Sequence, residues 1–136
     1  MAREDNSMSP DEIEAFLQGA EWLVLGFLND DGGPQAAVVP AKVVGSSLHF
    51  AVAAGSASEA CLKRDPRCCC TIDVFPSYYE IKGATVHGSA REVVDEALAE
   101  DLAARATAHG LAAGNVFAIS LLEDSFGFDF AKLERR

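Results

Sequence analysis

The hydrophobic and polar positions along the chain predict three helices separated by strand-like segments. The first helix is predicted between Ser9, which can cap its N-terminus, and Gly19, which can end it. Two more helices are predicted over residues 55–64 and 95–109, with Pro66 and Gly110 just beyond their ends. The first of these helices precedes the strand-like segments, and the other two lie between them.

Six segments show the alternation or the short apolar runs that are typical of β-strands. They cover residues 21–28, 35–44, 47–53, 67–75, 78–93 and 115–122, and residues 125–130 continue or follow the last of them. Pro40 lies inside the second segment and implies an edge or a bulge, because proline cannot donate to the ladder. The mostly short connections favour antiparallel pairing, and closure into a barrel removes exposed edges. We therefore expect a mainly β fold, a six-stranded antiparallel barrel with flanking helices.

The composition restricts the class of protein. A chain of 136 residues with 49% hydrophobic and 24% charged residues predicts a single soluble domain over residues 1–136. No apolar run approaches the ~20 residues of a membrane span, and the acidic N-terminus lacks the apolar core of a signal peptide. The four cysteines form no CxxC motif, so neither a zinc site nor covalently attached haem is predicted. These features favour a cytoplasmic protein without a metal centre.

The net charge of −10 argues against nucleic acid as a partner, but the charge is unevenly distributed. Residues 33–91 carry +2 and the rest of the chain carries −12. A basic segment in an acidic protein is compatible with a small anionic ligand. It is equally compatible with acidic flanking helices that are simply solvated, and the charge alone leaves both interpretations open.

The start of the second predicted helix is the strongest candidate for a binding site. A helix N-terminus presents unpaired N–H groups and a partial positive charge, Gly55 allows close approach, and Ser56 and Ser58 add hydroxyl groups. Glu59 argues for the simpler role, because its carboxylate can fold back onto the Ser56 N–H as in a capping box and would repel a phosphate. The segment is either a phosphate-binding site or an ordinary helix cap.

The sequence also assigns expectations to five other side chains, four of them from alternation along the strands. His49 points away from its apolar neighbours and is expected at the surface or at an interface, whereas Trp22 is expected in the core. Cys68 and Cys70 share a face with Ile72 and are expected to be buried. His87 lies on a polar face, where a role as haem ligand is the less favoured alternative.

Three stretches together resemble a known family: LVLGFLNDDGGPQAAVVPAKVV, LHFAVAAGSASEACLKRDPRCCCTID and YEIKGATVHGSAREV. They contain a DG-P turn at residues 31–34, an L-R-D-P-R-like end of a short helix at residues 62–67, and a G-x-A ending at residues 88–90. Their order and spacing are similar to those of the flavin-binding split-barrel family, which includes the pyridoxamine 5′-phosphate oxidases and small FMN-binding relatives. The resemblance covers about residues 10 to 133.

The resemblance implies a split β-barrel that forms a homodimer and holds FMN in a groove between the two copies. It places the cofactor phosphate where the third strand meets the short helix. The cofactor-binding residues that it implies are Ser56 and Ser58, nearby backbone at Ala53 and Ala54, and the basic partners Lys42 and Lys82. Many relatives carry Arg or Lys at positions 55–58, where this chain has none, while some small relatives also carry a glutamate at the position of Glu59.

The implied function is that of a flavin-dependent oxidoreductase acting on an unknown small-molecule substrate. The alternatives are a non-catalytic flavin or haem carrier, a relative that uses the deazaflavin F420, and a dimer without cofactor. No side chain stands out as an acid, base or nucleophile. The ending FDFAKLERR does not resemble the basic C-terminal substrate motif of true pyridoxamine 5′-phosphate oxidases, so that particular activity is not expected.

Overall fold

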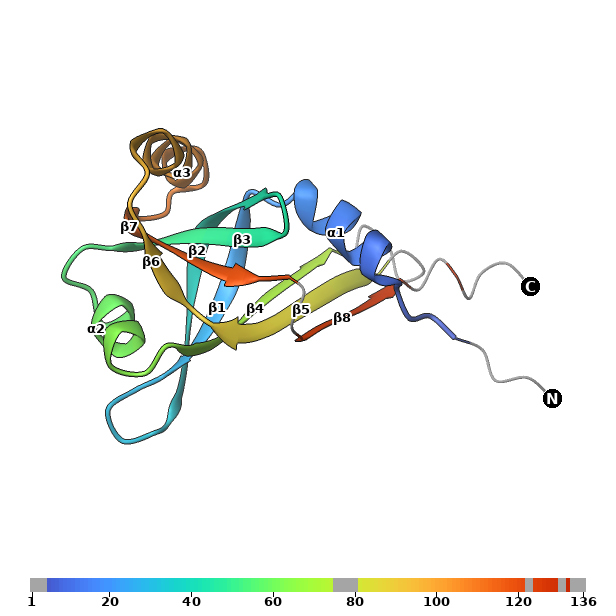
Figure 1. Ribbon diagram of the computed structural model, residues 1–136, viewed down its shortest axis with the longest axis horizontal. Coiled ribbons are helices and arrows are strands. Elements are labelled where there is room, and N and C mark those ends of the chain that lie inside the picture. Colours follow the sequence, from blue (N-terminus) through green and yellow to red (C-terminus); the bar gives the residue numbers. More distant parts are fainter. Residues whose placement is uncertain (1–4, 75–80, 122–123, 130–131, 133–136) are drawn as a thin grey trace.

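The computed structural model describes residues 5–74, 81–121, 124–129 and 132, and Figure 1 shows its ribbon. Within these residues it contains three helices and eight strands. The helices are α1 (Pro10–Gln18), α2 (Ala57–Arg64) and α3 (Glu96–His109). The strands are β1 (Trp22–Leu28), β2 (Pro34–Val44), β3 (Ser47–Ala53), β4 (Arg67–Val74), β5 (Lys82–Ser89), β6 (Arg91–Val93), β7 (Gly114–Ser120) and β8 (Asp124–Asp129).

All neighbouring strands pair antiparallel, in the order β6-β7-β3-β2-β1-β4-β5-β8. Only Ala90 separates β5 from β6, yet these two strands lie near opposite ends of the order. The sheet must therefore curl so that its two ends approach, and Figure 1 shows the strands crossing around a common interior. The fold is the split β-barrel that the sequence predicted.

The structure corrects the expected number of strands from six to eight within the described residues. The predicted strand over residues 78–93 divides into β5 and β6 at Ala90, where its partner changes from β4 to β7. The Ala90 N–H donates to the Pro66 carbonyl oxygen at 2.8 Å, which extends the β4–β5 register by one position, but Pro66 has no N–H to donate in return. Residues 75–80 lie outside the described residues. The second difference is at the C-terminal side, where β7 and β8 are separate strands that pair with different neighbours.

Pro40 is buried in an interior strand, which differs from the predicted edge or bulge. The register explains how the ladder tolerates it. β2 pairs with β1 up to Pro40, opposite Trp22, and pairs with β3 from Ala41 onward, opposite Phe50. The proline stands where the strand changes partners, so its missing N–H interrupts neither ladder.

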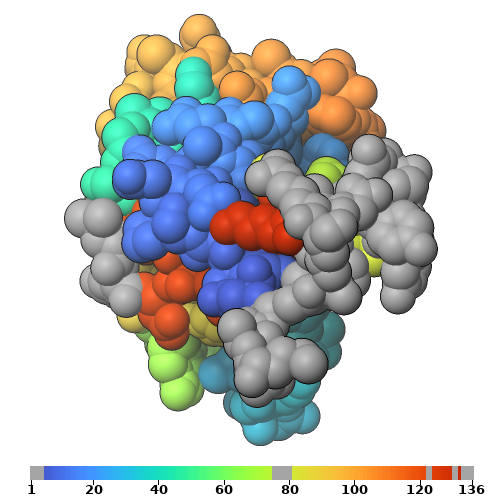
Figure 2. All heavy atoms as spheres, turned by 90° about the vertical axis from the view of Figure 1, so that its right-hand side faces the viewer, coloured from blue at the N-terminus to red at the C-terminus, as the bar shows by residue number. Residues whose placement is uncertain are grey.

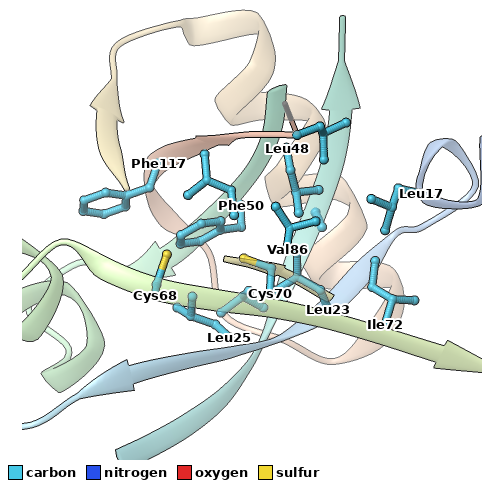
Figure 3. Packing of buried hydrophobic residues seen from close by; sticks show 14 of the residues in the cluster. Leu17, Leu23, Leu25, Leu48, Phe50, Cys68, Cys70, Ile72, Val86 and Phe117 are labelled. Atoms are coloured by element: carbon cyan, nitrogen blue, oxygen red, sulfur yellow. The ribbon is translucent and has the colours of Figure 1, made fainter. Parts of the chain in front are cut away.

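The interior of the barrel is filled by aliphatic, aromatic and cysteine side chains, as Figure 3 shows. The rings of Phe50 and Phe117 stack with centroids 6.0 Å apart. Cys68 and Cys70 both lie in this core, which confirms the prediction from alternation. Buried aromatic and aliphatic side chains of this kind are the main source of folding free energy.

Helices close the barrel at one end and cover one outer face. Ile13 and Leu17 of α1 belong to the core, and Figure 2 shows α1 (blue) across the end of the molecule beside β8 (red). Helix α3 covers the outer face of β3 and β7, where Leu98 and Leu102 pack on Ala51. The helix begins at its N-cap Asp95, which accepts a hydrogen bond from the Leu98 N–H at 3.1 Å.

Two of the expectations for single side chains are wrong. His49 is only 7% exposed, because α3 covers the face of β3 that also carries Ala51. Trp22 is 37% exposed and lines a hollow of about 220 Å³ with Val38 and Leu111, rather than packing in the core. Alternation gave the correct face for His49 but could not show that a helix lies over it.

Candidate functional site

The candidate site lies where the chain leaves β3 and enters α2. β3 ends at Ala53, and the backbone turns at Gly55, whose φ of +76° is a left-handed conformation that favours glycine. The Ser56 N–H donates to the Ala53 carbonyl oxygen at 3.1 Å and closes the turn. This turn places Ser56 at the N-cap of α2, directly after the end of the strand.

Two hydroxyl groups and one carboxylate gather at this helix N-terminus. Ser56 Oγ accepts from the Glu59 N–H at 3.2 Å and lies 3.0 Å from Ser58 Oγ. The Glu59 Oε1 atom accepts from the backbone N–H of Gly55 at 3.1 Å. The sequence predicted this carboxylate on the N–H of Ser56. That N–H is already bonded to Ala53, so the carboxylate bonds to the preceding residue instead.

The Glu59 carboxylate is held from three directions. Besides Gly55, it accepts a hydrogen bond from the side-chain amide of Asn115 on β7, and Lys63 Nζ lies 4.0 Å away. The Gly55 N–H, followed by Asn115, lowers the pKa of Glu59 below its usual value of 4.5, so the carboxylate is ionised at neutral pH. Only 12% of this side chain is exposed.

Asn115 is a site residue that the sequence did not reveal. Its side chain reaches Glu59 because β7 pairs with β3, with Asn115 opposite Val52, close to the end of β3 where α2 begins. Fifty-six positions separate Asn115 from Glu59 in the chain. Only the strand pairing brings them together, and no local pattern encodes that pairing.

Lys42 lies on the outer face of the barrel under α3. Its Nζ atom is 2.6 Å from Oδ2 of Asp101 on α3, and it stands opposite His49 in the β2–β3 ladder. His49 is four residues before Ala53, which corresponds to about 13 Å along an extended strand. Within one chain, Lys42 is therefore directed to α3 and is not among the residues at the α2 N-terminus.

Lys82 lies still farther from α2. Its Nζ atom is 5.4 Å from the centre of the Phe16 ring and 3.8 Å from Asp129 Oδ2. The opposite end of β5 is Ser89, which pairs with Arg67 just after α2. Seven residues along a strand span about 23 Å, and Figure 1 shows α2 and β8 toward different ends of β5. One chain thus brings together Ala53, Ala54, Ser56 and Ser58 but does not bring either lysine to them.

Two hollows of about 300 Å³ each flank this region. One lies between the first turn of α2 and the β1–β2 turn, with Ala57, Asp30 and Asp31 in its wall. The other lies on the outer face of the sheet, with Gly26 and Cys69 in its wall. Both are open and shallow enough that a second surface would be needed to enclose a ligand.

Other chemistry-bearing groups are dispersed over the described residues. His87 is exposed on β5, with Nδ1 3.8 Å from Asp124. Among the described residues, no cluster of three or more His, Cys, Asp or Glu side chains is arranged to hold a metal ion. None of the helices in that part of the chain combines the length and apolar character needed to cross a membrane.

The donors at the α2 N-terminus fit an anion of the kind that a flavin phosphate presents. The Ser56 and Ser58 hydroxyls lie together, the Gly55 N–H points at a carboxylate oxygen, and the helix adds partial positive charge. In the structure the Gly55 N–H donates to the chain's own Glu59 carboxylate, whereas the two hydroxyls bond to each other. The fit is therefore good in geometry and reduced in charge, since no Arg or Lys occupies positions 55–58.

Comparison with known proteins identifies the family to which these features belong. Residues 9–126 match the family model described as pyridoxamine 5′-phosphate oxidase. The chain has no match among curated proteins. Among solved structures, a conserved hypothetical protein from Mycobacterium tuberculosis is 22% identical with a TM-score of 0.79, and the alignment covers 100% of this chain and 94% of that one.

Two further similar structures are those of flavin-binding proteins. An FAD-binding protein from Mesorhizobium loti is 16% identical with a TM-score of 0.72, over 89% of this chain and 94% of that one. An FAD and haem binding protein from Mycobacterium smegmatis is 18% identical with a TM-score of 0.68, over 92% of this chain and 73% of that one. At these identities the likeness establishes the shared fold.

Proposed function

The chain belongs to the pyridoxamine 5′-phosphate oxidase family, and from this premise we propose that it binds a flavin and acts as an oxidoreductase on an unidentified small molecule. FMN is the flavin that we propose, and the protein is one domain that works as a cytoplasmic homodimer. The four free cysteines fit a reducing compartment. The observation that carries the proposal is the anion-binding geometry where β3 meets α2.

In this proposal the chain binds and orients the cofactor. The hydroxyls of Ser56 and Ser58 and the first N–H groups of α2 would hold the phosphate, with the backbone of Ala53 and Ala54 alongside. When bound, the flavin supplies the redox chemistry, while the protein provides its position and its shielding from water. The described residues offer no side chain that is placed as an obvious acid, base or nucleophile beside this junction.

A homodimer would explain why the two lysines lie apart from the phosphate-binding residues. In one chain, Lys42 and Lys82 are on different surfaces from α2, and the two hollows beside α2 are open. A groove between two copies would be lined by residues of both and would enclose a ligand that one copy leaves exposed. We propose that Lys42 and Lys82 contribute positive charge in that assembly.

A haem-binding carrier is the second candidate function. The exposed imidazole of His87 on β5 favours it, since histidine is a common haem ligand. The similar protein from Mycobacterium smegmatis is described as binding both FAD and haem. Flavin remains the first choice because the α2 N-terminus offers donors for a phosphate, whereas His87 is an exposed imidazole next to the carboxylate of Asp124.

The absorption spectrum of the purified protein, followed by titration with FMN, tests the proposed function. We expect a flavin spectrum, or quenching of flavin fluorescence on addition of FMN to protein purified without it. A Soret band would favour the haem carrier, and a deazaflavin spectrum would favour F420. If the protein is colourless and binds none of FMN, FAD, riboflavin, F420 or haem, the proposed function fails and the dimer without cofactor is the remaining candidate.

Replacing Ser58 with Asp tests the position of the phosphate. The new carboxylate would stand beside a phosphate dianion and remove a hydroxyl donor, so we expect FMN affinity to fall by about thirty- to several-hundred-fold. Asp is tolerated near a helix start, so the melting temperature should stay close to that of the wild type.

The control is Ser46→Asp, at an exposed serine in the turn between β2 and β3. This variant has the same change of charge and should bind FMN like the wild type. Equal affinity in the Ser58→Asp and Ser46→Asp variants would show that the phosphate does not bind at α2, even if the protein binds a flavin elsewhere.

A further inference from the structure

The Glu59 carboxylate lies at the junction of β3 and α2, where we propose that the phosphate binds. It lies one turn into α2, yet its side chain folds back to accept the Gly55 N–H at 3.1 Å. The Asn115 side-chain amide donates to its other oxygen, and Lys63 Nζ lies 4.0 Å from it. An internal anion therefore already takes the Gly55 N–H, which would otherwise face a ligand at this junction.

An ordinary capping role does not account for every part of this arrangement. A capping glutamate needs only a backbone N–H, and here that need is met by Gly55. Asn115, on strand β7, adds a second hydrogen-bond donor to the carboxylate. Lys63 adds a positive charge, and its Nζ atom also lies 3.6 Å from Oε1 of Glu92. The carboxylate is thus held by a strand, a turn and a helix, in the same way that a bound anion would be.

We propose that Glu59 determines specificity at this site: its carboxylate competes with the flavin phosphate for the N-terminus of α2 and must leave before the phosphate binds. This inference rests on the proposed flavin-binding function. It predicts that the phosphate contributes less to the affinity for the cofactor than the donors at this junction would allow without Glu59. The affinity for riboflavin, a flavin without phosphate, should therefore not depend on Glu59.

The test compares Glu59→Gln with Glu92→Gln in titrations with FMN and with riboflavin. Both glutamates lie within 4.0 Å of Lys63, so both variants remove one negative charge next to the same lysine. Only Glu59 accepts the Gly55 N–H. We expect Glu59→Gln to raise FMN affinity by about tenfold or more and to leave riboflavin affinity unchanged. Glu92→Gln should change neither value by more than about twofold.

Melting curves with and without inorganic phosphate give a readout that needs no flavin. Phosphate should raise the melting temperature of Glu59→Gln and not that of the wild type, because a ligand that binds only the folded protein stabilises it. Glu59→Ala, which removes the side chain and keeps a good helix former, serves as the second variant if the glutamine variant folds poorly.

The outcomes separate this inference from the proposed function. If the wild type binds FMN and neither Glu59 variant binds it more tightly, Glu59 is only a cap and the inference is overturned while the proposed function stands. An equal gain in Glu92→Gln would overturn it too, because the effect would be general charge. If no variant binds a flavin, the proposed function fails. The phosphate-dependent melting of Glu59→Gln then decides the inference by itself.

Discussion

His49 is the residue whose surroundings differ most from what its local sequence suggests. It is buried under α3, and its Nδ1 atom has no hydrogen-bond partner among the described residues. Burial lowers the pKa of His49 from its usual 6.5, and the Arg91 guanidinium lowers it further. The carboxylate of Asp95 and nearby backbone carbonyls oppose this shift without reversing it.

This burial predicts that acidification destabilises the fold. Because the folded-state pKa of His49 lies below 6.5, the unfolded chain binds more protons, so stability falls as pH drops through 6.5 toward the folded value. Urea titrations between about pH 7.5 and 5.5 should show this loss in the wild type and a flatter dependence in His49→Leu. His109→Gln, at a half-exposed histidine paired with Glu21, should keep the loss. An equally steep dependence in His49→Leu would contradict the prediction.

The carboxylates act in a separate pH range. The pKa of Glu12, which accepts from Lys132, and that of Asp65, which accepts from Arg67, are each lowered to about 2. Their contribution is present above their usual values of 4.5 and 3.8 and is lost as pH falls toward 2. The range from about pH 5.5 to 7.5 therefore reports on His49 rather than on these two carboxylates.

At the level of single residues, the sequence predicted backbone geometry better than surroundings. Ser9 and Ser56 cap helices as their local patterns indicated, because a cap depends only on the next few residues. The predictions for Trp22 and His49 were wrong because burial depends on elements that are distant in the chain. The location of Ser56 and Ser58 at the α2 N-terminus was predictable, but the Asn115 side chain that helps to hold Glu59 was not.

At the level of elements, α3 is attached to the barrel by a long-range contact rather than by pairs along its own surface. Asp101 and Arg105 have the spacing of an i,i+4 pair, but Asp101 binds Lys42. Arg105 Nη1 donates to the carbonyl oxygens of Ala20 at 3.0 Å and Ala41 at 2.7 Å. These two carbonyls flank the position where β2 changes its ladder partner.

Removing the Arg105 guanidinium should therefore weaken the attachment of α3 to the barrel. Arg105→Met keeps much of the apolar stem and leaves two partly buried carbonyls without their donor, which should cost about 1–3 kcal/mol of unfolding free energy. Asp101→Asn breaks only an exposed ion pair one turn away and should cost clearly less. Chemical denaturation measures both. A loss in Asp101→Asn as large as that in Arg105→Met would show that the ion pair holds the helix.

Element boundaries were predictable where a turn residue marks them, and this explains the error in strand number. Gly45 and Gly110 have positive φ at the ends that the sequence predicted. No such residue separates β5 from β6, since Ala90 continues the β4–β5 register through its bond to Pro66 before β6 pairs with β7. A strand that changes partners without a turn carries no local mark, and two strands were therefore predicted as one.

At the level of the whole molecule, one outer face of the barrel has the character of an interface. A single row across five strands runs from Val38 through Val24, Thr71 and Thr85 to Phe126, and none of these side chains is charged. Val38 is 48% exposed and Phe126 is 59% exposed. Large apolar side chains grouped on a sheet face mark a surface that another protein covers. The resemblance predicted a dimer, but only the register shows which side chains share this face.

We therefore expect two copies to associate through this face, and Val38→Arg tests the expectation. Stable dimers commonly bury on the order of 2,000 Å², and a guanidinium buried in such an interface would lose its hydration without a partner. Sedimentation of the wild type should give about twice the chain mass of 14.4 kDa. The Val38→Arg variant should sediment as a folded monomer.

Val44→Arg is the matched control, because Val44 lies on the same strand and is also 48% exposed, but outside this row. It should remain a dimer. Two dimeric variants would place the interface on another face, and a monomeric wild type would remove the intersubunit groove that the proposed flavin site requires.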